Sequence, residues 1–123
     1  GLFAAGGALM RLPRRVPYAV AMEMALTADP ITAEKAHELG LVARVAEPGK
    51  SLEVALELAE RIAKNSPLAV SASKQLIRET AGRTEEEFWA HQGALSAVVF
   101  KSEDAKEGPR AFAEKRAPNW QGK

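Results

Sequence analysis

Residues 102–116 read Ser-Glu-Asp-Ala-Lys-Glu-Gly-Pro-Arg-Ala-Phe-Ala-Glu-Lys-Arg and form the most informative segment of the chain. Ser102 is a good helix N-cap, and Glu103–Asp104 place two carboxylates at the positive end of the helix dipole. We expect Gly108–Pro109 to interrupt this helix, because proline has no N–H to donate and its ring collides with the preceding turn. The helix is expected to continue over Arg110–Arg116.

The end of this segment carries two adjacent cations, Lys115 and Arg116, shortly after the aromatic residue Phe112. Cations in the last turn of a helix interact favourably with its dipole, and the residues alone favour this structural explanation. The functional alternative is a site for an anion beside an aromatic ring. Both explanations stay open at this point.

The rest of the chain is predicted to be mainly α-helical, because apolar residues recur at the spacing of one helix face, as in residues 52–63. Only Leu41–Val45 has the character of a strand, with a turn expected at Glu47–Gly49. The sequence therefore predicts at most one short strand. The six or seven expected helices cover residues 16–27, 32–39, 51–65, 66–81, 84–101 and 102–116.

Several of these helices carry their own start and stop signals. Thr32 is a good N-cap, and Thr84 is expected to form a capping box with Glu87. Ser66–Pro67 combines a cap with a proline at the first helical position. Gly40 follows its helix at the place where a left-handed residue closes the last turn.

The composition is that of an ordinary globular chain. Its 123 residues suffice for one domain, 46% of them are hydrophobic and 27% are charged. The formal charge of +1 gives no strong field for nucleic acid or for a membrane surface, so we expect neither as a partner. The chain has no cysteine, which excludes disulfides and thiolate metal sites.

The first residues, Gly1–Gly7, are apolar and rich in glycine. They match neither the dinucleotide-binding pattern nor the P-loop, so a tight loop before a helix is favoured over a phosphate cradle. No basic segment of a signal peptide precedes them, and the chain does not begin with Met. We therefore expect that an upstream segment was removed by processing or proteolysis.

Other sites have little support in the sequence. His37 and His91 are the only histidines, and each has one glutamate a helical turn away, which leaves a metal without a third ligand. No Gly-x-Ser-x-Gly motif or thiol supports nucleophilic catalysis. The basic cluster Arg11–Arg15 is explained more simply as a solvated junction between helices than as a phosphate site, and no aromatic residue is interleaved with it for base stacking.

Three segments together resemble the enoyl-CoA hydratase/isomerase (crotonase) family. They are Gly6–Arg14 (GGALMRLPR), Ala21–Val42 (AMEMALTADPITAEKAHELGLV) and Ser102–Arg116. The last is similar to the family's C-terminal pattern S-x-D-x-x-E-G-x-x-A-F-x-E-K-R. The segments occur in the family's order and spacing, and the resemblance covers essentially the whole chain. It is specific for the superfamily and much less specific for one reaction within it.

The resemblance implies that this chain is the C-terminal helical, oligomerisation part of a crotonase-type α/β spiral fold. In that family an N-terminal spiral of ββα units holds the active site, and the C-terminal helices build trimers that often pair into hexamers. Residues 1–50 would be the end of the crotonase core with its connecting helices, and residues 51–123 the C-terminal helical trimerisation region. A self-associated or domain-exchanged homo-oligomer is therefore expected.

The implied reaction is that of a lyase in fatty acid β-oxidation, the hydration of trans-2-enoyl-CoA to 3-hydroxyacyl-CoA, with a cytoplasmic location. The substrate carries coenzyme A itself, so no separate cofactor is expected. The oxyanion hole and both catalytic glutamates of the family would lie upstream of Gly1, so this sequence is expected to contain no catalytic residue. We accordingly expect the 123 residues to be inactive on their own.

Two groups of residues match substrate-binding positions of the family. Phe112 and Lys115 match positions that approach the adenine and phosphate end of coenzyme A, in some members from a neighbouring subunit. Phe3, Gly6 and Gly7 match the loop that helps to wall the acyl pocket. The alternatives are a non-catalytic helical module that oligomerises or binds coenzyme A, and another crotonase-family activity such as enoyl-CoA isomerisation.

Overall fold

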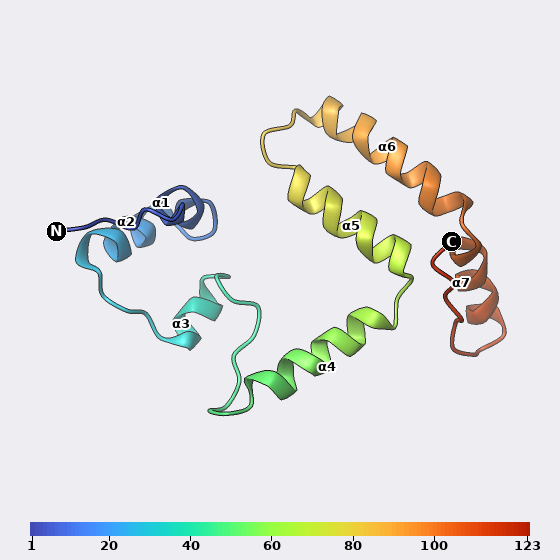
Figure 1. Cartoon of the computed structure of the whole chain (residues 1–123), viewed down its shortest axis with the longest axis horizontal. Helices are drawn as coiled ribbons and strands as arrows, with labels where there is room; N and C mark the ends of the chain where they lie inside the picture. Colours follow the sequence, from blue (N-terminus) through green and yellow to red (C-terminus); the bar gives the residue numbers. More distant parts are fainter. The chain divides into compact units, whose positions relative to one another are not determined.

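Helices form all the regular structure of the chain, as a computed structural model describing residues 1–123 shows (Figure 1). Seven α-helices and one short 3₁₀ helix are present and no strand, which confirms the predicted mainly α class. None of the helices is both long enough and apolar enough to cross a bilayer. The elements are α1 (Ala8–Arg11), η1 (Leu12–Arg14), α2 (Tyr18–Thr27), α3 (Ala33–Glu38), α4 (Ser51–Ala63), α5 (Pro67–Glu79), α6 (Glu85–Lys101) and α7 (Glu103–Ala113).

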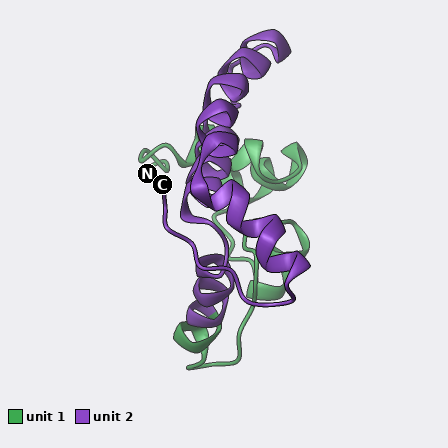
Figure 2. Ribbon diagram, turned by 90° about the vertical axis from the view of Figure 1, so that its right-hand side faces the viewer, with its two compact units in different colours: residues 1–54 green, residues 55–123 purple.

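The chain divides into two compact units, Gly1–Val54 and Ala55–Lys123 (Figure 2). In the first unit the buried apolar residues are Val16, Ala21 and Ala36. In the second unit a small group is buried that includes the polar residues Ser102 and Asp104. The roles predicted for residues 1–50 and 51–123 stay predictions.

The segment Leu41–Val45, predicted as a strand, is irregular in the structure. The Leu41 and Val42 N–H groups both donate to the Ala36 carbonyl, at 2.8 and 3.3 Å, and Gly40 takes the left-handed conformation with φ 74°. These bonds close the last turn of α3, at the position that the sequence predicts from Gly40. They also use the N–H groups of Leu41 and Val42, which a strand would need for hydrogen bonds to a neighbouring strand. The strand prediction was wrong because a strand also requires a partner strand, and this chain contains none.

In the second unit α5 and α6 lie side by side as an antiparallel pair (Figure 1). The Ser66 hydroxyl accepts from the Ala69 N–H at 3.5 Å at the start of α5. At the start of α6, Thr84 and Glu87 cap each other's backbone N–H groups in the predicted capping box. Local sequence signals therefore set the start of each of these two helices.

Helix α7 runs without interruption from Glu103 to Ala113 and contains Pro109. The predicted break at Gly108–Pro109 was therefore wrong. A proline disfavours the helical conformation of the preceding residue partly through a clash with that residue's Cβ, and Gly108 has none. A Cβ at Gly108 would lie 3.5 Å from the Trp120 ring, an ordinary van der Waals distance, so the C-terminal tail passes close to the helix here.

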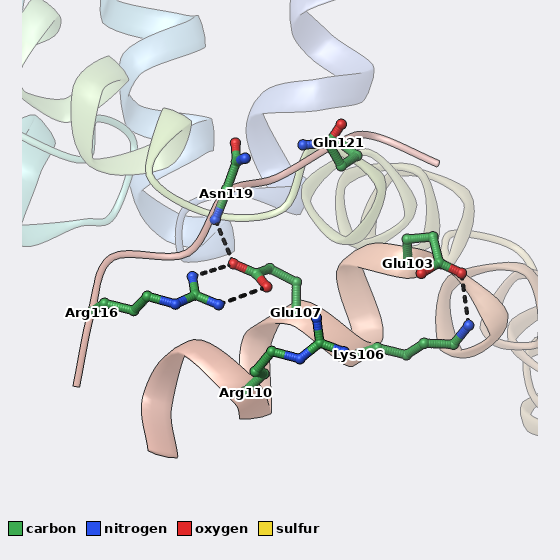
Figure 3. A pocket seen from close by; sticks show the side chains of 7 residues that line it. All are labelled: Glu103, Lys106, Glu107, Arg110, Arg116, Asn119 and Gln121. Atoms are coloured by element: carbon green, nitrogen blue, oxygen red, sulfur yellow. Dashed lines mark hydrogen bonds and ion pairs between the residues drawn. The ribbon is translucent and has the colours of Figure 1, made fainter. Parts of the chain in front are cut away.

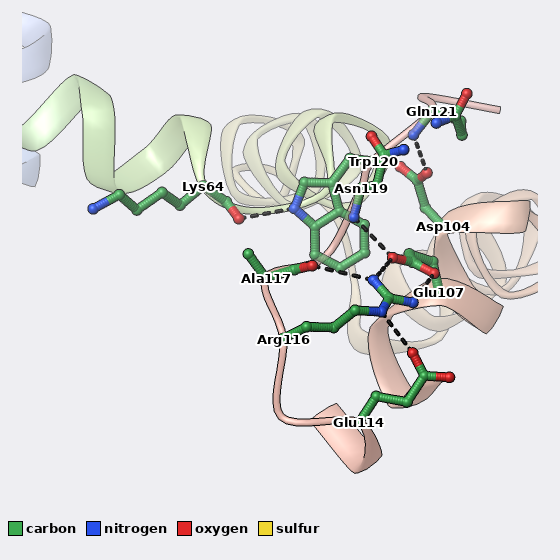
Figure 4. Close-up of polar contacts among 9 residues, drawn as sticks. All are labelled: Lys64, Asp104, Glu107, Glu114, Arg116, Ala117, Asn119, Trp120 and Gln121. Carbon is green, nitrogen blue, oxygen red and sulfur yellow. Dashed lines mark hydrogen bonds and ion pairs between the residues drawn. The ribbon is translucent and has the colours of Figure 1, made fainter. Parts of the chain in front are cut away.

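The tail after α7 folds back and is fixed by hydrogen bonds (Figure 4). The Trp120 indole N–H donates to the Lys64 carbonyl at 2.8 Å, and the Glu103 N–H donates to the Lys123 carbonyl at 2.8 Å. These bonds connect the last residues with the junction of α4 and α5 and with the first turn of α7. The tail is thus an integral part of the second unit.

We predict that Trp120→Phe lowers the free energy of unfolding by about 1 kcal/mol, because it removes one hydrogen bond while keeping most of the aromatic surface. The measurement is urea denaturation followed by circular dichroism. The matched control is Trp89→Phe, since the Trp89 N–H bonds only the exposed Glu85 carboxylate at 3.1 Å. The control is expected to change stability by less than about 0.5 kcal/mol, and equal effects of the two substitutions would contradict the anchoring role.

Candidate functional site

A pocket of about 330 Å³ opens where the C-terminal tail passes over α7 (Figure 3). Its lining is almost entirely charged or amide-bearing, and most of its charges are already paired within the chain. Lys106 pairs with Glu103 at 2.7 Å, and Arg116 pairs with Glu107. The lining residues are Glu103, Lys106, Glu107, Arg110, Arg116, Asn119 and Gln121.

Asp104 is the most enclosed charged group of the chain, with 3% of its surface exposed. Its carboxylate accepts from the Ser66 hydroxyl at 2.7 Å, from the Gln121 N–H at 2.7 Å and from the Gly122 N–H at 3.2 Å. Burial raises the pKa of Asp104, but the hydrogen bonds outweigh it and hold the pKa below the ordinary value. One carboxylate therefore connects α7, the start of α5 and the tail.

Glu107 makes the second connection between α7 and the tail (Figures 3 and 4). Its two oxygens accept from Arg116 Nη1 at 2.5 Å and Nη2 at 3.0 Å, a bidentate pair, and Oε1 also accepts from the Asn119 N–H at 2.8 Å. The Arg116 guanidinium and the Asn119 N–H lower the pKa of Glu107 to about 2. The same pair raises the pKa of Arg116, so both groups stay ionised over the physiological range.

Lys115 lies at the end of α7 in an unusual backbone conformation. Its φ of 54° falls in the left-handed region, which side chains with a Cβ rarely adopt. The Lys115 N–H donates to the Phe112 carbonyl at 3.2 Å, and the Arg116 N–H donates to the Ala111 carbonyl at 3.0 Å. These two bonds form a Schellman motif, the same closure that Gly40 provides for α3.

Phe112 and Lys115, the residues predicted to bind coenzyme A, therefore lie within one turn at the end of α7. The Phe112 side chain is 87% exposed, although Ala111 beside it is 1% exposed. The Lys115 ammonium makes no hydrogen bond or ion pair in the chain, and neither residue lines the pocket of Figure 3. Their role in binding stays a prediction.

The predicted acyl-pocket residues lie in the first unit, close to the N-terminus. Phe3 is 77% exposed in an irregular segment, and no atom lies within 4 Å of a Cβ placed on Gly6. Gly7 precedes α1 with φ 84°, and a Cβ there would meet the Arg11 guanidinium carbon at 3.3 Å. The structure thus requires glycine at position 7 for backbone reasons, and the pocket role of all three residues stays a prediction.

No group of three or more His, Asp or Glu side chains is placed to hold a metal ion. His91 lies beside Glu79, with 2.5 Å between Nε2 and Oε2, and so connects the end of α5 with α6. His37 lies with Nδ1 3.2 Å from the Val42 carbonyl, next to the closure of α3. Both histidines are therefore explained by local contacts.

Sequence reasoning missed the connections made by Asp104 and Glu107. The sequence indicates only a helix-dipole role for Asp104, because two of the groups that donate to its carboxylate lie 17 and 38 residues away along the chain. Glu107 and Arg116 stand nine residues apart with opposite charges on either side of the end of a helix. That spacing is the signal that would have predicted an ion pair across the turn.

The fold of this chain matches about half of each of several solved enoyl-CoA hydratase structures. The structure of an enoyl-CoA hydratase from Mycobacterium tuberculosis H37Rv matches with a TM-score of 0.94 and 54% identity, over 100% of this chain and 49% of that one. Enoyl-CoA hydratase EchA1 from Mycobacterium marinum matches with a TM-score of 0.95 and 53% identity, again over 100% and 49%. The fold is therefore the helical C-terminal portion of the crotonase fold.

The family model for enoyl-CoA hydratase/isomerase matches residues 1–123, and this chain belongs to that family. Enoyl-CoA hydratase EchA19 of Mycobacterium tuberculosis is 48% identical over 99% of the chain, which covers 46% of that protein. Carnitinyl-CoA dehydratase of Salmonella arizonae is 41% identical over 99% of the chain and 48% of its own length. The chain thus spans about half the length of the relatives that it matches.

We predict that Lys115→Gly raises the free energy of unfolding by about 0.5–1 kcal/mol, because glycine adopts the left-handed conformation without a Cβ penalty. The measurement is urea denaturation of the two chains under identical conditions. The opposite change, Gly82→Ala, should lower the free energy of unfolding by about 1 kcal/mol, because a residue with a Cβ is strained at φ 86°. No atom within 4 Å would obstruct the new Cβ, so this backbone strain is the whole effect. A destabilised Lys115→Gly chain would show that the lysine side chain itself stabilises the fold.

Proposed function

We propose that this chain is the C-terminal portion of an enoyl-CoA hydratase and that it binds the adenine and phosphate end of coenzyme A through Phe112 and Lys115. The main support for this site is that the Phe112 and Lys115 side chains make no hydrogen bond or ion pair, whereas most other polar side chains of the same segment do. Ser102, Asp104, Glu107, Glu114 and Arg116 all bond within the chain. The exposed ring and ammonium have no such structural task.

The chemistry of this pair suits the nucleotide end of coenzyme A. A lysine ammonium is a compact charge that recognises phosphate, and an aromatic face stacks on a purine base. Arg110 is also without an ion pair, but it is close to two carboxylates. Arg116 is the main cause of the lowered pKa of Glu107 and Lys106 of the lowered pKa of Glu103, and the Arg110 charge contributes to both. Lys115 is therefore the better candidate for an incoming anion.

The proposed reaction of the whole protein is hydration of trans-2-enoyl-CoA to 3-hydroxyacyl-CoA in fatty acid metabolism. Addition of water to such a thioester needs N–H donors for the developing oxyanion and carboxyl groups that handle the water and the proton. We propose that the 123 residues supply none of these groups and contribute substrate binding and assembly. Relatives named as hydratases and as carnitinyl-CoA dehydratases support this class of reaction, and enoyl-CoA isomerisation is the alternative within the family.

A second role, self-association, is favoured by the apolar surface of the second unit. Large side chains are exposed along α4, α5 and α6, and a groove of about 310 Å³ between α5 and α6 is lined mainly by apolar residues. Exposed apolar area on this scale is typical of interaction surfaces. The exposed residues are Leu56, Ile62, Ile77, Trp89, Val98 and Phe100.

We predict that Lys115→Gln abolishes the preference of the chain for coenzyme A over 3′-dephospho-coenzyme A. The unmodified chain should bind coenzyme A about threefold more tightly, the effect of one exposed ion pair, and calorimetric titration with the two ligands measures the ratio. Phe112→Ala should lower the affinity for both ligands about tenfold, because it removes the ring that stacks on the base. Lys106→Gln is the control, because it removes an equal charge that Glu103 already pairs. A preference unchanged by Lys115→Gln would disprove the site.

We also predict that the purified 123-residue chain does not hydrate crotonyl-CoA and that it forms an oligomer in solution. The assay follows loss of the enoyl absorbance, while light scattering on the same sample gives the mass and detects any longer species. Hydration by a sample free of longer species would mean that the catalytic groups lie within these residues. A monomer at high concentration would count against the assembly role.

A further inference from the structure

Lys115 is one of only two residues other than glycine with a positive φ, the other being Ala28. The remaining left-handed positions, such as Gly40 and Gly82, are glycines, which adopt this conformation without strain. A lysine in this conformation persists only where its surroundings impose it. The contacts around Lys115 must therefore do what a glycine does elsewhere in the chain.

Arg116, the next residue, supplies those contacts (Figure 4). Its N–H donates to the Ala111 carbonyl, and its guanidinium donates to Glu107, to Glu114 at 2.6 Å and to the Ala117 carbonyl at 3.1 Å. Glu107 lies in the middle of α7, nine residues before Arg116. The residue after Lys115 is thus anchored to the helix that precedes it.

This anchoring restricts Lys115. A rotation of its backbone into the right-handed region would continue the helix and carry Arg116 away from the Glu107 carboxylate. The bidentate geometry tolerates little displacement, because both guanidinium N–H groups must stay aligned with the two oxygens. Conformational freedom lost before binding does not have to be lost when a ligand arrives.

We propose that the Glu107–Arg116 ion pair positions Lys115, holding its backbone left-handed so that the ammonium is presented to the ligand from a fixed point. The pair makes no contact with the ligand in this role, so Glu107 and Arg116 are positioning residues. This inference rests on the proposed binding of coenzyme A by Lys115. It has a conformational consequence that is measured without any ligand.

The test variant is Glu107→Gln, which removes the charge of the carboxylate and keeps its size. The control is Glu103→Gln on the same helix, because the Glu103 carboxylate pairs with Lys106 and makes no contact with Arg116. The first readout is the one-bond coupling between the α carbon and the α proton of Lys115, which depends on the backbone angles, in the isotope-labelled 123-residue chain. It should report a left-handed φ in the unmodified chain and the control, and an average over conformations in Glu107→Gln.

The second readout is the ratio of affinities for coenzyme A and 3′-dephospho-coenzyme A. Glu107→Gln should remove most of the roughly threefold preference expected for one exposed ion pair. In a Lys115→Gln background the same substitution should change the ratio no further, because both changes act through one ammonium. Glu103→Gln should leave the ratio intact.

The outcomes separate the two proposals. If Glu107→Gln leaves both the coupling at Lys115 and the affinity ratio as they were, the positioning role is overturned while the Lys115 site stands. If the unmodified chain shows no preference for coenzyme A, the proposed binding site fails, whatever the coupling shows. A changed coupling with an unchanged, Lys115-dependent ratio also overturns the positioning role, because the conformation would then have no effect on binding.

Discussion

The Asp104 carboxylate holds together the parts of the second unit that are most distant in sequence. It accepts hydrogen bonds from a hydroxyl at the start of α5 and from two backbone N–H groups of the tail. Asp104 itself lies in the first turn of α7. Few large apolar side chains are buried in this unit, so packing alone would not define the path of the tail. A buried carboxylate must find donors, and here they are the Ser66 hydroxyl and two backbone N–H groups of the tail. The Arg116–Glu107 ion pair and the hydrogen bond from Trp120 to Lys64 hold the same tail at further points.

Signals within a few residues of each other predicted the helices well. Thr32, Ser66 and Thr84 act as caps at the expected positions, and Gly40 closes α3 as expected. These predictions succeed because a cap satisfies backbone groups that the helix itself leaves unpaired. They depend only on neighbouring residues, which a sequence displays directly.

The predictions that failed depend on combinations of residues that no single local signal describes. Leu41–Val45 has a strand-like composition, but its outcome depends on a partner strand and on the amides that α3 uses at its end. Pro109 is accommodated because the residue before it is a glycine, a combination whose effect differs from that of either residue alone. The bonds from Trp120 to Lys64 and from Gln121 to Asp104 join positions that no periodicity relates. The resemblance to the family predicted Phe112 and Lys115 as residues of the candidate site. The left-handed backbone of Lys115 is seen only in the structure.

The anchored tail also makes the last residues a sensor of local opening. Gln121, Gly122 and Lys123 all contribute backbone groups to hydrogen bonds with the first turn of α7. A protease needs an extended, unbonded segment, so it can cut at these residues only during the moments when the tail has detached. The rate of cleavage therefore measures how often the tail leaves α7.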